Sequence, residues 1–266
     1  MSTRTTPARW VEPFFVHSFD VNHLGLSTSV TLLKMMQEAA WKHAEAIGVG
    51  FEQMKRTGLF WVLSRLQIRI TRYPAWGEEF MLETWPSGIQ RLLVTRDFRI
   101  TDDRGIAAAA TSSWIVLDVN TRRPVRPQNA FETIPIVPTD ELALGEVAAR
   151  VELPAETDAL DWHESKPFMV RVSALDSQAH VNNARYLEWC LDAFSIDHFA
   201  AWEVREATLN FLSETHCNEE IRVRTAELDS PGESDLRTIQ QVVAEGGNPS
   251  FACLLRWAPR RLQPSA

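Results

Sequence analysis

Two stretches of the sequence decide the fold, because each is nearly a copy of the other. Residues 13–20 read PFFVHSFD, and residues 167–172 read PFMVRV and are followed by Asp176. Each stretch leads into a polar turn and then into an amphipathic helical pattern, which indicates that a whole structural unit occurs twice. We therefore predict two similar domains in tandem.

Each copy continues with a helix whose apolar residues recur at helical spacing. The first helix is predicted over residues 29–47, with Gly48 directly after it. The second is predicted over residues 183–199, behind Asn182, whose side chain is suited to capping a helix. Both helices should bury one face.

Four alternating segments follow each helix. In the first copy one side of the first strand carries Leu66, Ile68 and Ile70, and the other side carries Arg65, Gln67 and Arg69. In the second copy the alternation is repeated by Ala207, Leu209 and Phe211. The remaining strands are expected within residues 76–82, 90–101 and 106–118, and within 217–223, 236–245 and 250–258.

An antiparallel sheet with one apolar face, wrapped around a central helix, buries both apolar surfaces. The sequence therefore predicts an α+β fold made of two hotdog domains. We expect the first at residues 11–130 and the second at 166–260. The segment 131–165 is rich in Pro, Glu and Ala and is expected to be a linker.

Composition narrows the class of protein. The formal net charge of -8 argues against a nucleic-acid partner, because phosphate contacts need an excess of Lys and Arg. Cys190, Cys217 and Cys253 form neither a disulfide framework nor a CxxC cluster, which favours free thiols in a reducing compartment. The N-terminus lacks a signal-peptide core, and no apolar run approaches the ~20 residues of a membrane span. We expect a cytoplasmic protein.

One polar cluster stands out where standard active-site signatures are missing. No nucleophile elbow, phosphate loop, dinucleotide fingerprint or zinc motif occurs, so neither a metal nor a cofactor is expected. Residues 176–183 read DSQAHVNN and lead into the second helix. Unpaired N–H groups in the first helical turn would stabilise an oxyanion that develops on a bound carbonyl.

A purely structural interpretation of this cluster stays open. Asp176, Asn182 and Asn183 could simply cap the helix, and His180 could be an exposed turn residue. The first copy has a polar turn at residues 20–25 with a different spacing, so a polar turn here does not require catalysis.

A second difference between the copies concerns a carboxylate. Glu214 falls opposite Tyr73 when the copies are aligned, so only the second copy has an acid there. A Glu beside an apolar pocket can activate water as a general base, and burial would raise its pKa. The alternative is a surface Glu in a polar turn that also holds Glu219 and Glu220.

These segments resemble the plant-type and bacterial acyl-ACP thioesterase family along nearly the whole chain. The N-terminal likeness is carried by residues 33–48, 60–68, 72–78, 111–114 and 121–124. The C-terminal likeness is carried by residues 176–183 and 214–215. The resemblance implies an enzyme of fatty acid biosynthesis that hydrolyses fatty acyl-ACP to free fatty acid and holo-ACP.

The resemblance also assigns roles to residues. Asp176, His180 and Glu214 match the catalytic Asp, His and Glu of the family. Gln178 stands where the family has Asn, and Thr215 stands where plant members have Cys, which favours attack by activated water over a Cys nucleophile. In this scheme Glu214 activates the water, while His180 and Gln178 orient the substrate or water. Asp176 either fixes His180 or attacks the carbonyl directly.

Substrate contacts are expected from Asn182, Asn183 and Thr215, and Met36 is expected in an acyl pocket formed by the first domain. Acyl carrier protein is acidic, so this acidic enzyme would need a local basic patch to recruit it. Two groups of residues are candidates for that patch: Arg65 with Arg69, and Arg122 with Arg123 and Arg126.

Three rival functions remain open: an acyl-CoA thioesterase, a hotdog hydratase or dehydratase, and a non-catalytic acyl-binding protein. The chain-length preference is also open. A homodimer is among the assemblies that the sequence allows.

Overall fold

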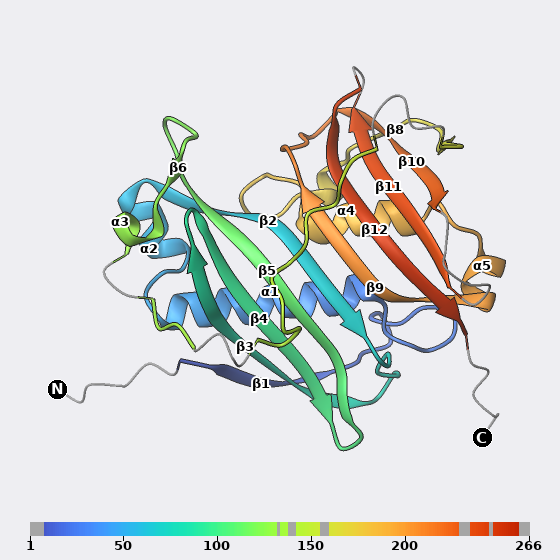
Figure 1. Cartoon of the computed structure of the whole chain (residues 1–266), viewed down its shortest axis with the longest axis horizontal. Coiled ribbons are helices and arrows are strands. Elements are labelled where there is room, and N and C mark those ends of the chain that lie inside the picture. The colour runs from blue at the N-terminus through green and yellow to red at the C-terminus, as the bar shows by residue number, and fades with distance from the viewer. Residues whose placement is uncertain are drawn as a thin grey trace. The chain divides into compact units, whose positions relative to one another are not determined.

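The computed structural model describes residues 8–131, 134–137, 142–154, 160–228, 235–244 and 247–260. The chain divides into two compact units, unit 1 at Met1–Ala148 and unit 2 at Ala149–Ala266. Each unit combines an antiparallel sheet with one main helix (Figure 1). Within the described ranges, no helix is long and apolar enough to cross a membrane.

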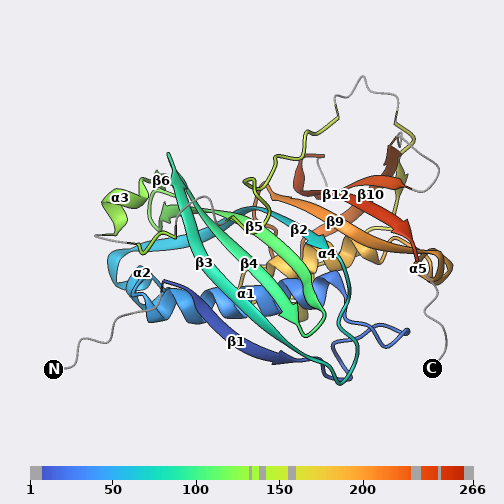
Figure 2. The ribbon, with the colours of Figure 1, turned by 60° about the horizontal axis from the view of Figure 1, so that its bottom comes forward.

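Unit 1 has the strand order β1-β3-β4-β5-β2, and every neighbouring pair is antiparallel. Its strands are β1 (Trp10–Phe15), β2 (Leu59–Ile70), β3 (Glu79–Gln90), β4 (Leu93–Asp102), β5 (Gly105–Asp118) and β6 (Pro124–Val125), which pairs with β5. Its helices are α1 (Ser29–Ala46), α2 (Phe51–Thr57) and α3 (Pro127–Ala130). Figure 2 shows α1 lying along one face of this sheet.

The sequence around α1 explains its position. The Oγ1 atom of Thr28 accepts a hydrogen bond from the Thr31 amide at 3.0 Å and so caps the helix. Leu33, Met36 and Ala40 share one side and are buried. The predicted helix over residues 29–47 is thus confirmed, with one residue fewer at its end.

Unit 2 repeats this plan with the strand order β9-β12-β11-β10-β7. Its strands are β7 (His163–Glu164), β8 (Phe168–Met169), which pairs with β10, β9 (Trp202–Phe211), β10 (Glu220–Leu228), β11 (Leu236–Ala244) and β12 (Pro249–Pro259). Its described helices are α4 (Asn183–Leu191), α5 (Ile196–Ala201) and the one-turn 3-10 helix η2 (Val172–Ala174). Leu187 on α4 and Leu209, Phe251 and Trp257 on the sheet are all buried.

The predicted single helix over residues 183–199 is wrong, because α4 ends at Leu191. The Oγ atom of Ser195 accepts a hydrogen bond from the His198 amide at 3.2 Å and starts the separate helix α5. Between the two helices Phe194 packs its ring against Trp257, with centroids 4.8 Å apart. This aromatic contact holds the turn against the sheet.

The outer face of the unit 1 sheet is more buried than the alternating pattern predicted. Gln67 was expected on a polar face, yet it is 4% exposed. Part of the predicted linker lies against this face, since the Val137 amide donates to Pro86 O at 2.9 Å and Glu146 pairs with Arg69. This segment covers the sheet face that points away from α1, and polar side chains on that face become buried.

The most telling of these buried groups is the Asp97 carboxylate, which is 0% exposed. It accepts hydrogen bonds from the Thr111 hydroxyl and from the Ala143 amide. Burial raises the pKa of Asp97 above its ordinary value of 3.8. The folded protein therefore holds this proton more tightly than the unfolded chain does.

We expect this proton to make stability depend on pH. As pH rises from the ordinary pKa of 3.8 through the raised folded pKa, the unfolded chain ionises first, so Asp97 lowers the free energy of unfolding. Asp97→Asn should lack this decrease, because its amide can donate to Thr111 and accept from Ala143. Urea unfolding of both proteins between about pH 4 and pH 8 measures the difference. Identical pH profiles for the two proteins would contradict the assignment.

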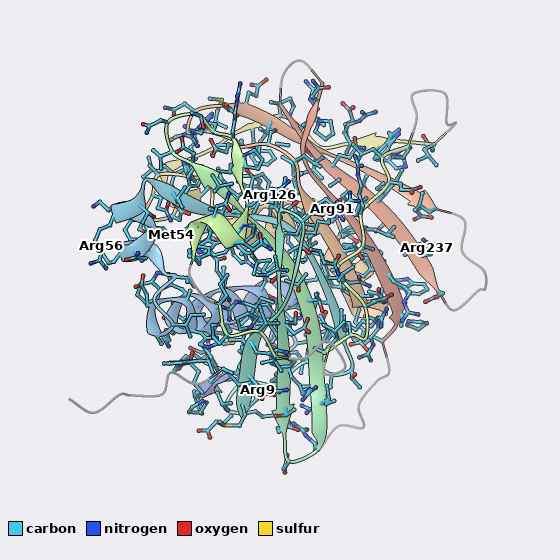
Figure 3. All side chains as sticks on the ribbon, turned by 60° about the vertical axis from the view of Figure 1, so that its left-hand side comes forward. Arg9, Met54, Arg56, Arg91, Arg126 and Arg237 are labelled. Atoms are coloured by element: carbon cyan, nitrogen blue, oxygen red, sulfur yellow. The ribbon has the colours of Figure 1, made fainter. Side chains whose placement is uncertain are left out.

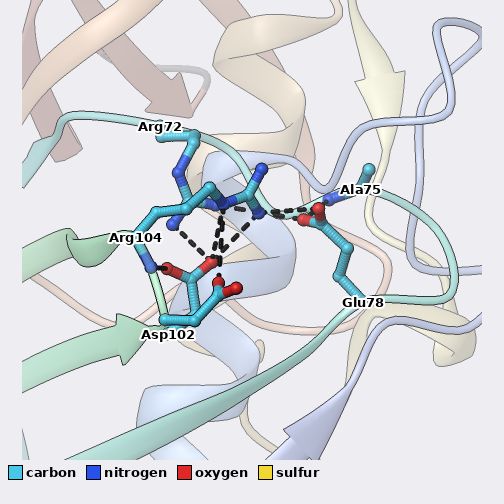
Figure 4. A network of polar contacts seen from close by, with 6 residues as sticks. Arg72, Ala75, Glu78, Asp102 and Arg104 are labelled. Atoms are coloured by element: carbon cyan, nitrogen blue, oxygen red, sulfur yellow. Dashed lines mark hydrogen bonds and ion pairs between the residues drawn. The ribbon is translucent and has the colours of Figure 1, made fainter.

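A polar network closes the far end of the unit 1 sheet, where β4 turns into β5. Arg104 pairs with Glu78 at 2.6 Å and with Asp102 at 3.0 Å (Figure 4). Arg72 also pairs with Asp102, and Glu78 accepts a hydrogen bond from the Ala75 amide at 2.8 Å (Figure 4). The network ties the turn after β2 to the β4–β5 hairpin.

Candidate active site

A turn of the same length precedes the main helix in both units. The turns at residues 21–27 and 175–181 are each closed by an antiparallel bridge between their end residues. The next residue is the helix N-cap in both cases, Thr28 in unit 1 and Asn182 in unit 2. The two turns therefore align residue by residue without a gap.

In unit 2 this turn is organised by Asp176. Its Oδ1 atom accepts hydrogen bonds from the amides of Gln178 at 2.8 Å and His180 at 3.2 Å. Ala179 adopts a left-handed conformation with φ 61°, as Gly25 does at the same position of unit 1 with φ 72°. This conformation costs an Ala roughly 1 kcal/mol, so the turn holds some backbone strain.

In unit 1 the same two hydrogen bonds are made by Asn22. Its Oδ1 atom accepts from the amides of Leu24 at 2.9 Å and Leu26 at 3.3 Å. The alignment of Asp176 with Asp20, and the different spacing inferred from it, are therefore wrong. One side-chain oxygen is enough to build this turn, and Asn supplies it as well as Asp does.

What differs between the turns is the chemistry of three side chains. Leu24 and Gln178 are both exposed, and Leu26 and His180 are both half-buried. In the described part of the chain, neither the Gln178 nor the His180 side chain makes a hydrogen bond, and nor does Oδ2 of Asp176. These groups do not maintain the turn and are available to a ligand.

The turn delivers the chain to the N-terminus of α4. Asn182 caps the helix, with its Oδ1 atom accepting from the Ala184 amide at 2.9 Å, and its own amide donates to Ala174 O at 2.9 Å. The structural role considered for Asn182 is therefore present. Asn183 begins the helix, and its N–H has no acceptor among the residues described. An N–H of this kind can bind an oxyanion.

The carboxylate expected in the site follows the next strand. Glu214 lies three residues past Phe211, the end of β9, as Tyr73 lies three past Ile70, the end of β2. The Glu214 side chain is exposed, which agrees with the alternative of a surface Glu in a polar turn and not with burial beside an apolar pocket. The adjacent Thr215 points inward instead and is 2% exposed.

Tyr186 on α4 connects this segment to the helix and was missed in the sequence. It is 4% exposed, and its ring stacks on Phe251 with centroids 5.3 Å apart. Burial raises the pKa of Tyr186, an effect opposed by its contact with Thr215 and increased by the charges of Glu219 and Glu214. The buried Oγ1 of Thr215 has no hydrogen bond of ordinary geometry in the described residues. The sequence signal for Tyr186 was a hydroxyl group on the apolar side of the first turn of the predicted helix.

The predicted site residues thus form two groups around one helix. Asp176, Gln178 and His180 share the turn before α4, whereas Thr215 contacts Tyr186 of α4 and Glu214 is the exposed residue before Thr215. Tyr186 lies four residues past Asn182, about 6 Å along the helix axis. Met36 belongs to unit 1, where it is 1% exposed on α1. Over the described ranges, no cluster of His, Cys, Asp and Glu could hold a metal ion.

In each unit one sheet packs on one main helix, which is the hotdog arrangement. Polar groups lie at the N-terminus of the main helix of unit 2. Comparison with family models specifies the class further. The chain belongs to the acyl-ACP thioesterase family: the model of its N-terminal domain matches residues 8–133, and that of its C-terminal domain matches residues 157–258.

Curated relatives agree with this family. Oleoyl-acyl carrier protein thioesterase 1 of Arabidopsis thaliana is 28% identical over 227 residues, which cover 76% of this chain and 59% of the relative. Palmitoyl-acyl carrier protein thioesterase of Gossypium hirsutum is 25% identical over 268 residues, which cover 95% of this chain and 64% of the relative. The chain therefore spans about three fifths of the length of these relatives, both of which are described as chloroplastic.

Solved structures share the fold. An acyl-ACP thioesterase from Bacteroides thetaiotaomicron superposes with a TM-score of 0.79 at 23% identity, covering 94% of this chain and 98% of that one. The 12:0-ACP thioesterase from Umbellularia californica gives a TM-score of 0.78 at 22% identity, covering 95% of each chain. The predicted α+β double hotdog is confirmed.

Proposed function

We propose that this protein hydrolyses fatty acyl-ACP to free fatty acid and holo-ACP. Membership of the acyl-ACP thioesterase family supports the reaction class. The observation that carries the proposal is the asymmetry between the two aligned turns. Both turns need one oxygen at the position of Asp176, but only the second adds a carboxylate, an amide and an imidazole.

In the proposed mechanism the thioester carbonyl lies at the N-terminus of α4. The Asn183 N–H and the Gln178 amide donate to the carbonyl oxygen, where negative charge develops. Glu214 takes a proton from water as the water oxygen bonds to the carbonyl carbon. The tetrahedral intermediate then collapses and the C–S bond breaks. Protonated Glu214 returns its proton to the leaving thiolate.

His180 and Asp176 are proposed to act together in this scheme. His180 orients the water or the substrate, and the available Oδ2 of Asp176 holds the imidazole in place. A second route, in which Asp176 attacks the carbonyl and water cleaves the resulting anhydride, uses the same residues. The exposure of Glu214 supports the water route, because solvent can reach that carboxylate directly.

Thr215 and Asn182 are proposed as substrate contacts rather than catalytic groups. Thr215 replaces the thiol of plant members, and a Thr hydroxyl is a weak nucleophile without an adjacent base. Its buried Oγ1 is suited to donating a hydrogen bond to the substrate.

The acyl chain is proposed to lie in the N-terminal hotdog, residues 11–130, against the apolar side of α1 that includes Met36. Its far limit would be His43, whose Nδ1 accepts a hydrogen bond from Arg96 at 3.0 Å. Burial lowers the pKa of Arg96 to about 10, so it stays charged at neutral pH and marks a polar end to the apolar stripe. Catalysis is assigned to residues 166–260, with 131–165 as linker.

The setting proposed for the enzyme is a reducing, cytoplasmic one, which the free Cys190, Cys217 and Cys253 support. Acylated acyl carrier protein is the proposed partner. Light scattering of the purified protein tests whether two copies associate as a homodimer.

Free-thiol release from matched acyl-ACP and acyl-CoA substrates tests the proposal. We expect faster turnover of acyl-ACP, expressed as kcat/KM. A preference for acyl-CoA would overturn the carrier, and turnover of an enoyl thioester without thiol release would indicate a hydratase. Binding of acyl-ACP without hydrolysis would indicate an acyl-binding protein.

A further inference from the structure

The basic residues of unit 1 gather at one end of its sheet, which we name the basic end. They come from α2, from the β3–β4 turn and from the segment around β6: Lys55, Arg56, Arg91, Arg122, Arg123 and Arg126. All of them are exposed. Figure 3 looks onto this end and shows Arg91 and Arg126 close together, with Arg56 on α2 further to the left.

Strand pairing explains why these residues meet although they are far apart in the sequence. Leu59, which follows α2, pairs with Asp118 at the end of β5, and the Val119 amide donates to Gly58 O at 2.9 Å. Arg91 lies in the tight turn after β3, and Leu93 on the other side of that turn pairs with Ile115 of β5. The start of β2, the β3–β4 turn and the end of β5 therefore lie at the same end of the sheet, and the basic side chains of these segments are grouped there.

Few carboxylates oppose this charge. Among the described residues, Lys55, Arg91 and Arg123 form no ion pair with a carboxylate. The carboxylate of Asp118 is engaged within its own turn, where it accepts hydrogen bonds from the amides of Asn120 and Thr121. Asp118 keeps its negative charge there and Glu52 lies on α2, so the six basic residues outnumber two acids in the same segments and the basic end has a net positive charge.

The opposite end of the sheet has the reverse character. Across β3, roughly 35 Å away, Glu78, Glu79, Asp102 and Asp103 line an open pocket. Arg104 in this pocket is paired with three of these acids, Glu78, Asp102 and Asp103 (Figure 4). The other candidate patch is also weaker, since Arg69 is paired with Glu146. One end of unit 1 is thus suited to an acidic partner.

We propose that the basic end is the docking surface for an acidic acyl carrier protein. This inference rests on the proposed function, which supplies a carrier protein as substrate. Exposed Leu92 and Val119 lie among the charges and offer apolar contact at the centre of such an interface. An anionic lipid surface would also fit basic and apolar groups, but the carrier is the partner that the substrate requires.

The test combines charge reversal with two substrates. Arg123→Glu/Arg126→Glu should raise KM for acyl-ACP by about tenfold or more at low salt and weaken its salt dependence. Turnover of an acyl-N-acetylcysteamine thioester, which has no carrier, should be unchanged. Arg123→Lys/Arg126→Lys should behave as wild type. Arg237→Glu, on β11 of unit 2 opposite Arg256, is the matched control and should leave KM unchanged.

Binding of fluorescently labelled holo-ACP, measured by anisotropy, tests docking without turnover. Loss of binding in the double Glu variant alone supports the proposal. Binding of the same variants to phosphatidylglycerol vesicles is measured in parallel. Equal binding of holo-ACP by all variants overturns the proposal, and so does a double Glu variant that loses binding to the vesicles but not to holo-ACP. If wild-type protein hydrolyses neither substrate, the proposed function fails separately, while the anisotropy result still decides on docking.

Discussion

Asp176→Asn should lower kcat for acyl-ACP by about a hundredfold or more and leave the fold intact. Asn22 builds the same turn in unit 1 with a side-chain amide, so Asn at position 176 should keep both hydrogen bonds of the turn. The substitution removes only the negative charge and one acceptor atom. Steady-state free-thiol release measures kcat, and urea unfolding checks that the free energy of unfolding is unchanged.

The matched control for this experiment is Asn22→Asp. It places the same carboxylate in the aligned turn of unit 1, which has leucines where unit 2 has Gln178 and His180. Activity should stay at the wild-type level. If Asp176→Asn kept full activity, Asp176 would be a turn residue only, and its catalytic role would be rejected.

Glu214→Gln should also lower kcat by about a hundredfold or more, because the proposed general base loses its ability to take a proton from water. KM should change little, since the side chain keeps its size and its hydrogen-bonding reach. Rates are compared under saturating acyl-ACP, with acyl-N-acetylcysteamine as a second substrate to separate chemistry from docking.

Glu219→Gln is the control, because it removes the same negative charge from the surroundings of Tyr186. The charges of Glu219 and Glu214 both raise the pKa of Tyr186, so the two variants alter the electrostatics of α4 in one direction. Only Glu214→Gln should lose activity. Equal losses in both variants would assign the effect to the local field and would contradict a general base at position 214.

The repeated pattern was sufficient to predict the fold. Alternation and helical spacing identified α1 and the long strands, because each of these elements buries one face along its whole length. The break after Leu191 was missed since residues 192–199 continue an apolar spacing, whereas the cap at Ser195 depends on a single hydroxyl. The burial of Gln67 was missed because alternation shows which face of a strand a residue occupies, but not what packs on that face.

The sequence located the residues of the candidate site but not their register. Aligning Asp176 with Asp20 followed residue type, whereas the structure aligns Asp176 with Asn22 through two matching hydrogen bonds and a matching bridge. Tyr186 was hidden among apolar residues of α4. The exposure of Glu214 depends on how the loop after β9 turns, which puts Thr215 inside and leaves Glu214 outside.

Exchange of the side chains between the two turns tests the central claim most directly. One variant gives unit 2 the chemistry of unit 1: Asp176→Asn, Gln178→Leu and His180→Leu. The other gives unit 1 the chemistry of unit 2: Asn22→Asp, Leu24→Gln and Leu26→His. The two residues of each exchanged pair are either both exposed or both half-buried, so both variants should fold. We predict that free-thiol release from acyl-ACP is abolished in the first variant and retained in the second; retained activity in the first would contradict catalysis at the α4 turn.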